Sequence, residues 1–156
     1  MFREKPLNYF ITFVVILIIW FVTALTIVPW LGDRISLKEL PIDELQSYLK
    51  IIFSIGGVFP LIFSFIWFYW GDKPTAASSP SLAKRIWLSF LFILIGISLA
   101  LIFAIFIYLS IKGETIGVLD YIILYLSLAL QTFFAFWLST FFFSPINVKY
   151  IPLFKK

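Results

Sequence analysis

The stretch that decides the fold reads IWLSFLFILIGISLALIFAIFIYLSI, residues 86–111. It contains no Asp, Glu, Lys, Arg or His, and it exceeds the roughly 20 residues that a helix needs to cross the hydrocarbon core of a bilayer. Lipid cannot satisfy free backbone N–H and C=O groups, and the stretch lacks the alternation of polar and apolar residues that barrel strands show. We therefore predict a transmembrane helix here.

Three more apolar runs without charged residues lie at about 8–30, 51–70 and 121–144. Together the four runs explain why the chain is 62% hydrophobic and only 13% charged, whereas a soluble domain is about half apolar and a quarter charged. The sequence predicts an all-α membrane protein, with a single membrane domain over residues 1–156 that forms a four-transmembrane-helix bundle with short loops. The first run lacks a small-x-small cleavage site, so we interpret it as an uncleaved anchor.

Basic residues are unequally divided between the two sides of this bundle. If the N-terminus is cytoplasmic, only Arg34, Lys38, Lys50 and Lys112, four of the twelve Lys and Arg residues, lie on the other side. Positively charged loops favour the cytoplasm, so this division predicts that both termini are cytoplasmic. The bias toward Phe, Ile and Lys suggests a bacterial protein, and we expect it in the cytoplasmic (inner) membrane. No soluble basic surface is predicted, so nucleic acid is not an expected partner.

Residues 31–50 form the longest predicted external loop. Residues 36–39, Ser-Leu-Lys-Glu, have the spacing of a capping box, whose side chains satisfy backbone N–H groups at the start of a helix. Pro41, followed by two acidic residues, is also typical of a first helical turn. We predict a short external amphipathic helix over about 36–49, whose apolar side rests on the membrane surface or contacts a partner.

The sequence offers few of the side chains that catalysis inside a membrane uses. It has no Cys and no His, which excludes thiolate or imidazole ligation of zinc and haem and nucleophiles activated by His. The apolar runs also lack carboxylates, which proton relays and intramembrane aspartyl proteases need. We predict that the chain is not an enzyme and has no catalytic residue, no metal site and no cofactor.

Small residues recur every four positions in the third run, at Gly96, Ala100 and Ala104. This small-xxx-small spacing lets two helix backbones approach closely in lipid. The spacing alone does not say which helix approaches. The stripe packs either against another helix of the same bundle, which we favour, or against another subunit.

The fourth run has a second stripe at the same spacing, formed by Ser127, Gln131, Ala135 and Ser139. Gln131 is the most polar residue deep in any predicted span, and an amide in hydrocarbon needs hydrogen-bond partners. We expect Gln131 to bond to a neighbouring helix. The alternative is that it lines a path for a substrate or ion.

The second run contains Gly56, Gly57 and Pro60. Pro60 has no N–H to donate to the carbonyl of Gly56, at a point already loosened by two glycines, so we predict a kink there. Such a kink commonly only shapes a bundle, although in transporters a helix break can form a binding site. Trp20, in the middle of the first run, is expected to pack against lipid or a helix, and the less favoured alternative is contact with a ligand.

Two classes of function fit these features. The first is a non-catalytic polytopic membrane subunit that anchors or scaffolds a larger membrane complex, such as an envelope-spanning secretion or motility machine. The second is a subunit of an oligomeric channel or transporter. The first predicts that Gln131 and the freed carbonyl of Gly56 are occluded by helix packing, and the second predicts that they face a shared cavity.

The expected partners are the lipid bilayer and other membrane-protein subunits, in a hetero-complex or a homo-oligomer. The chain ends in a short basic tail, Lys155-Lys156. We expect a complete small membrane subunit in preference to the membrane part of a longer protein.

Overall fold

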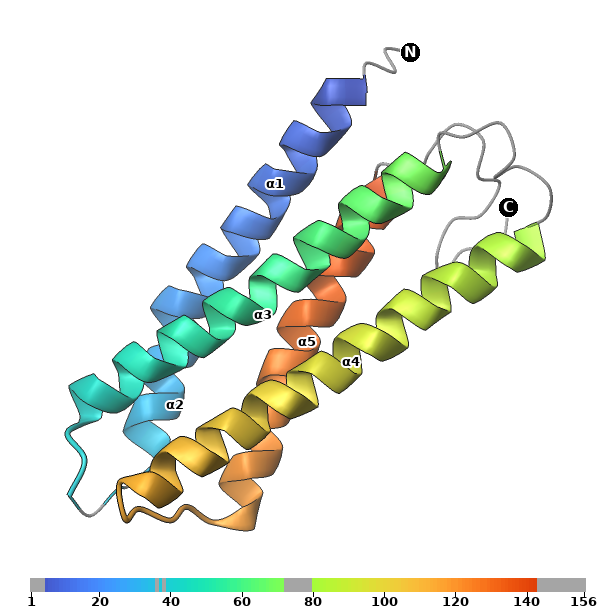
Figure 1. Cartoon of the computed structure of the whole chain (residues 1–156). Coiled ribbons are helices and arrows are strands. Elements are labelled where there is room, and N and C mark those ends of the chain that lie inside the picture. Colours follow the sequence, from blue (N-terminus) through green and yellow to red (C-terminus); the bar gives the residue numbers. More distant parts are fainter. Residues whose placement is uncertain (1–4, 36, 38, 72–79, 143–156) are drawn as a thin grey trace.

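The computed structural model describes residues 5–35, 37, 39–71 and 80–142, and regular structure over these residues is entirely helical (Figure 1). The elements are α1 (Lys5–Val22), the π-helix η1 (Thr23–Ile27), α2 (Val28–Arg34), α3 (Ile42–Gly71), α4 (Pro80–Ile111) and α5 (Val118–Phe142). α1, η1 and α2 run on as one helical segment. Within the described residues four helical segments are therefore long and apolar enough to cross a membrane, Tyr9–Arg34, Ile42–Gly71, Pro80–Ile111 and Val118–Phe141. The predicted all-helical fold with four helices that could span a membrane is confirmed for the described residues.

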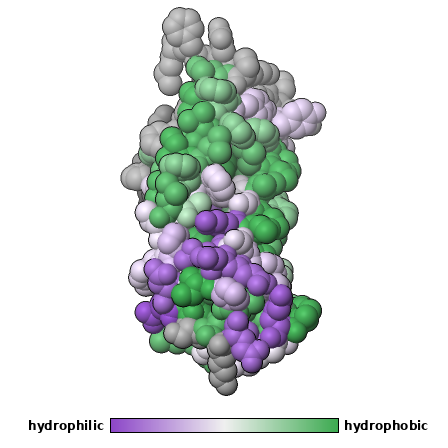
Figure 2. Space-filling model, turned by 90° about the vertical axis from the view of Figure 1, so that its left-hand side faces the viewer, coloured by the Kyte–Doolittle hydropathy of each residue, from purple (hydrophilic) through white to green (hydrophobic). Residues whose placement is uncertain are grey.

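The four segments pack around a central pair of helices. α3 and α5 lie against each other, and both α1 and α4 pack on this pair. The connections 35–41 and 112–117 lie at the same end of the bundle, which is the lower end in Figure 1 and is called the loop end below. In Figure 2 the surface of one face is mostly apolar, and polar side chains lie toward the loop end. A bundle embedded in lipid is expected to show this distribution.

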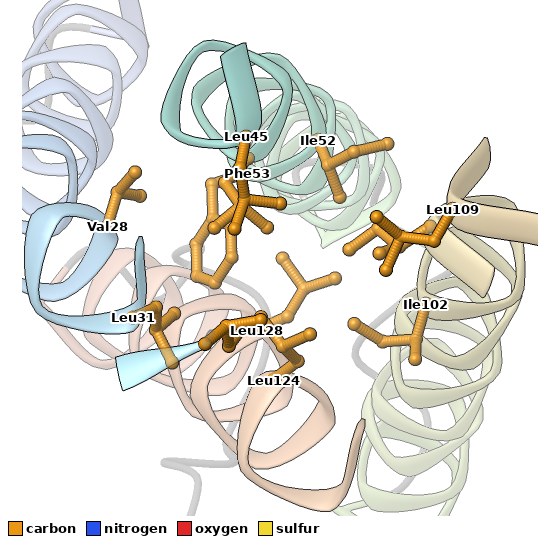
Figure 3. Close-up of a cluster of buried hydrophobic side chains, with 12 residues drawn as sticks. Val28, Leu31, Leu45, Ile52, Phe53, Ile102, Leu109, Leu124 and Leu128 are labelled. Carbon is orange, nitrogen blue, oxygen red and sulfur yellow. The ribbon is translucent and has the colours of Figure 1, made fainter. Parts of the chain in front are cut away.

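Buried apolar side chains form two clusters along the bundle. The cluster near the loop end draws on α2, α3, α4 and α5, whose side chains point toward one another in Figure 3. Its labelled members are Val28, Leu31, Leu45, Ile52, Phe53, Ile102, Leu109, Leu124 and Leu128. The second cluster is mainly aromatic and is built around Trp67, Phe68, Trp87 and Phe136. The indole N–H of Trp87 donates to Thr140 Oγ1 at 2.9 Å, so its polar atom is satisfied inside the bundle.

The first span accommodates a proline through the π-helix. Pro29 lacks an N–H, and its ring would clash with the carbonyl four residues earlier in a regular α-helix. The turn before it is widened, and the N–H of Val28 bonds to the carbonyl of Thr23, five residues back. The hydroxyls of Thr23 and Thr26 donate to the carbonyls of Ile19 and Val22 at 2.8 and 2.7 Å. The span thus continues as helix to Arg34, beyond its predicted end near residue 30.

The predicted external helix over 36–49 takes a different form. Ser36 and Lys38 of the expected capping box lie outside the described residues, while Leu37 and residues 39–41 are not helical. Helix begins at Ile42 and continues directly into the second span as α3. The sequence before Pro41 favours extended backbone, and the N–H groups of Glu39 and Leu40 bond to the distant side chain of Glu114, so they have no need of a helical cap.

α4 ends in a Schellman motif, which positions Glu114. Gly113 has a φ of 74°, a left-handed conformation that glycine adopts without strain. The N–H of Gly113 bonds to the carbonyl of Ser110 at 3.1 Å, and the N–H of Glu114 bonds to that of Leu109 at 2.9 Å. The chain turns sharply here, and Glu114 is buried at the loop end.

Candidate functional site

The polar centre of the membrane core is the contact between Gln131 of α5 and α3. Gln131 is 5% exposed, and its Nε2 donates to the backbone carbonyl of Phe53 at 3.0 Å. Its Oε1 is buried and has no hydrogen-bond partner among the described residues. This is the interhelical hydrogen bond expected from the sequence, although only one of the two polar atoms of the amide is satisfied.

Gly56 and Gly57 allow the close approach of α3 and α5 at this level. A Cβ placed on Gly56 would lie 2.6 Å from Leu128 Cδ1, and one on Gly57 would lie 3.6 Å from Gln131 Nε2. Both glycines and Pro60 are buried. α3 is helical without interruption from Ile42 to Gly71, through Pro60, and the kink predicted there stays a prediction.

The remaining members of the α5 stripe also face inward. Ala135 and Ser139 are buried, and Ser139 Oγ donates to the carbonyl of Ala135 at 2.6 Å. Ser127 is partly buried. Next to this stripe, Ser98 Oγ of α4 lies 3.3 Å from Thr132 Oγ1 of α5, a buried contact that joins α4 to the central pair of helices.

The small residues of α4 lie on the outside of the chain. Gly96 and Ala100 are exposed, and in the described part of the chain no atom lies within 4 Å of a Cβ placed on Gly96. Ala104 is partly buried, and its carbonyl accepts a hydrogen bond from Tyr48 at 3.4 Å. Internal packing, the favoured interpretation of this stripe, is therefore wrong for Gly96 and Ala100. Helix spacing could not reveal this, because α4 is apolar on all sides.

A shallow hollow of about 580 Å³ lies over this face of α4. Its lining is Gly96, Leu99, Ala100, Ile102, Phe103, Phe106 and Tyr121. The absence of side-chain bulk at two positions creates the hollow between larger neighbours. An adjoining helix or lipid chains can fill it equally well by shape.

Two further grooves flank α1. One, of about 390 Å³, lies between α1–η1 and α5 and is lined by Ile18, Ile19, Val22, Thr23, Ile27, Ser127, Leu130, Gln131 and Phe134. The other, of about 260 Å³, lies between α1 and α3. In its wall the indole N–H of Trp20 donates to Ser54 Oγ at 2.7 Å, and Ser54 donates to the carbonyl of Lys50 at 2.6 Å. Trp20 therefore packs on a helix, which agrees with the favoured packing role.

Glu114 ties the two connections of the loop end together. Its side chain is 3% exposed, and its Oε1 accepts hydrogen bonds from the backbone N–H groups of Glu39 and, at 2.9 Å, Leu40. Bonds to a charged acceptor are among the stronger hydrogen bonds in proteins. Sequence reasoning missed this role, and the only local sign of it was the glycine after the last turn of the third run.

A second set of contacts at the loop end joins α3 to α4. Glu44 Oε1 accepts a hydrogen bond from Tyr108 at 2.8 Å and pairs with Lys112 Nζ at 2.9 Å. The hydrogen bond to Glu44 and its negative charge raise the pKa of Lys112 above its ordinary value. The ring of Tyr48 stacks on Tyr108, with centroids 3.9 Å apart. Farther along this end, Arg34 Nε of α2 lies 3.6 Å from Asp120 Oδ1 of α5.

Several of the polar contacts described above join different helices, so they hold the bundle together. Among the described residues no three His, Cys, Asp or Glu side chains are placed to hold one metal ion. No protein-family model matches the chain, and no curated protein or solved structure is significantly similar to it.

Proposed function

We propose that the chain is a non-catalytic polytopic membrane subunit that anchors or scaffolds a larger membrane complex. The observation that carries this proposal is the burial of Gln131 and Gly56 between α3 and α5. A path for a polar solute would have to expose these groups to water. Here the amide bonds to Phe53 and the glycine lies against Leu128, which is the arrangement of a packing element.

The outer face of α4 supports the same proposal. Gly96 and Ala100 leave a hollow that faces away from the other helices of the chain. In lipid no hydrophobic force draws helices together, and interfaces use small residues that let backbones approach. The partners we propose are the surrounding bilayer and membrane-protein subunits, in a hetero-complex.

The setting we propose is the bacterial cytoplasmic (inner) membrane, with both termini in the cytoplasm. The division of Lys and Arg residues between the two sides supports this orientation. An envelope-spanning secretion or motility machine is the kind of assembly in which such a small, loop-poor subunit would serve.

The test is purification of the tagged chain from its native membrane in a mild detergent, with measurement of the particle mass and identification of every protein that remains bound. We expect a stable particle much heavier than the 18.1 kDa chain, with defined membrane-protein partners. Recovery of the chain alone, across several detergents and in native nanodiscs, would contradict the proposal.

The alternative, a subunit of an oligomeric channel or transporter, is supported by the polar side chains of Thr23, Ser127 and Gln131 in the groove beside α5. The chain has no cysteine, so a Gln131→Cys variant carries a single thiol. A scaffold predicts that this thiol resists a membrane-impermeant maleimide, as a buried core position should. Rapid labelling, together with a homo-oligomeric particle, would favour transport.

A further inference from the structure

The connection between α2 and α3 forms part of a small hollow at the loop end, the lower end in Figure 1. The hollow measures about 170 Å³, and its lining is Asp33, Ile35, Leu37, Leu40, Ile42 and Leu45. Ile35 and Leu45 are buried, whereas Asp33 and Ile42 are exposed. Small-molecule sites usually measure about 300–1,000 Å³, so this hollow is too small for such a ligand and has room for one long side chain.

Hydrogen bonds hold the backbone on both sides of the hollow. The N–H of Ile35 bonds to the carbonyl of Leu31 at 3.0 Å, which closes the last turn of α2. The N–H of Leu40, on the other side of the connection, bonds to Glu114 Oε1 at 2.9 Å. A side chain that enters the hollow therefore meets a preformed site and does not have to order it first.

The charges around the hollow favour a cation. Asp33 lies in the last turn of α2, where the helix carbonyls already give a partial negative charge. Arg34 of the same turn pairs with Asp120, whereas Asp33 makes no ion pair with any described residue. The positive end of α3 does not reverse this preference, because its first turn already carries two acidic residues. Residues 31–50 and 112–120 together hold six of the eight acidic residues of the chain but only four of the twelve basic ones.

Lys and Arg side chains fit this hollow better than other cations do. Calcium needs about six to eight oxygen ligands, and Asp33 supplies the one carboxylate among the described lining residues, which are otherwise aliphatic. A phospholipid headgroup brings a phosphate, which Asp33 and Glu39 would repel. Lys and Arg instead combine an aliphatic stem with a terminal positive charge.

We propose that the hollow receives a Lys or Arg side chain from an extramembrane segment of a partner subunit. The aliphatic stem packs against Ile35, Leu40 and Leu45, and the charged group pairs with Asp33. This contact rests on the proposed function and adds to it a place and a chemistry of recognition. It also gives Glu114 a further role, because its hydrogen bonds fix the backbone on one side of the hollow.

The first test is photo-crosslinking in native membranes. A photo-crosslinking phenylalanine replaces Ile42, which lines the hollow and is 52% exposed. The control replaces Ile51 on the same helix, which is 56% exposed and outside the hollow. We expect Ile42, and not Ile51, to crosslink to an extramembrane segment of a partner subunit, at or beside a Lys or Arg residue.

The second test reverses the charge of Asp33. A lysine is favourable at the C-terminal end of a helix, so Asp33→Lys should fold. We expect this variant to lower recovery of the crosslinked partner by about tenfold or more. Placing Asp at the Lys or Arg position of the partner should restore recovery. Asp43→Lys makes the same change of charge at the same end but outside the lining, and should leave recovery nearly unchanged.

Full recovery with Asp33→Lys, an equal loss with Asp43→Lys, or failure of the partner substitution to restore recovery would overturn the proposal. Crosslinks from Ile42 only to lipid, to a second copy or to a segment without Lys or Arg would overturn it as well. Absence of any partner of the wild-type chain would instead refute the proposed function itself.

Discussion

Gly56 and Gly96 occupy opposite environments, although both are glycines within transmembrane helices. A Cβ on Gly56 would meet buried Leu128, whereas one on Gly96 would have none of the described atoms within 4 Å. We predict that Gly56→Leu lowers the free energy of unfolding of the isolated chain by about 2 kcal/mol through overpacking between α3 and α5. Gly96→Leu should not lower it. Reversible unfolding in mixed micelles measures both.

Gly96→Leu also separates folding from assembly. If α4 contacts a partner, this variant should keep its stability and lose part of its recovery with the complex. Equal destabilisation by the two variants would contradict the placement of Gly96 outside the bundle.

The two small-residue stripes show how far single residues could be interpreted from the sequence. The inward position of Gln131 followed from the high cost of an unpaired amide in lipid. Gly96 and Ala100 carry no such cost on either side, because small apolar residues are tolerated both inside a bundle and facing lipid. Their outward position depends on how α4 is rotated about its axis, and that rotation is set by contacts such as Ser98 with Thr132.

At the scale of elements, long charge-free runs were enough to predict four helical spans, but not where each helix ends. The first span continues through Pro29 because a π-turn removes the expected clash, and α3 starts at Ile42 with charged residues in its first turn. The connection before α3 is held by Glu114, more than seventy residues away. Contacts at that separation leave no pattern in a single sequence.

Removing the Glu114 carboxylate should therefore loosen the 37–41 connection. We predict that Glu114→Ala, which leaves the N–H groups of Glu39 and Leu40 without this acceptor, costs about 1–3 kcal/mol. Glu114→Gln keeps a carbonyl oxygen and should cost less. Hydrogen exchange at these two amides, followed by mass spectrometry, should accelerate most in the alanine variant. Unchanged exchange in both variants would refute the role assigned to Glu114.

The contact between Lys112 and Glu44 predicts a dependence on pH at the α3–α4 junction. The contact with Glu44 raises the pKa of Lys112 in the folded state above its ordinary value of 10.5. The contact therefore stabilises the fold at pH values below the unfolded-state pKa of Lys112. This contribution disappears as the pH rises through the folded-state pKa. Wild type should exceed Lys112→Met in thermal midpoint at neutral pH, by a small margin because the pair is exposed. The difference should vanish at strongly alkaline pH and shrink in high salt. A difference that grows with pH would exclude this assignment.

At the scale of the whole molecule, the arrangement of spans follows from the two hairpins. Both turn at the loop end, and α3 and α5 become the central pair because the glycines of one and the inward stripe of the other permit close contact. The sequence predicted the helical class because lipid leaves backbone groups without partners, and it predicted four candidate spans because four charge-free runs are long enough to cross the hydrocarbon core. It could not predict which pair would be central, because that depends on the fit of facing surfaces such as Gly56 against Leu128.

The orientation of the bundle gives the last prediction. Thr115 at the loop end and Ser81 near the opposite end are both exposed, and each becomes the only thiol of the chain when replaced by Cys. If the distribution of basic residues sets the topology, an impermeant maleimide added to intact cells, or to spheroplasts where an outer membrane blocks access, should label Thr115→Cys and not Ser81→Cys. Permeabilised membranes should label both, which controls for reactivity. Labelling of Ser81→Cys alone would reverse the orientation and place the polar end held by Glu114 in the cytoplasm, so that soluble partners of that end would have to be sought there.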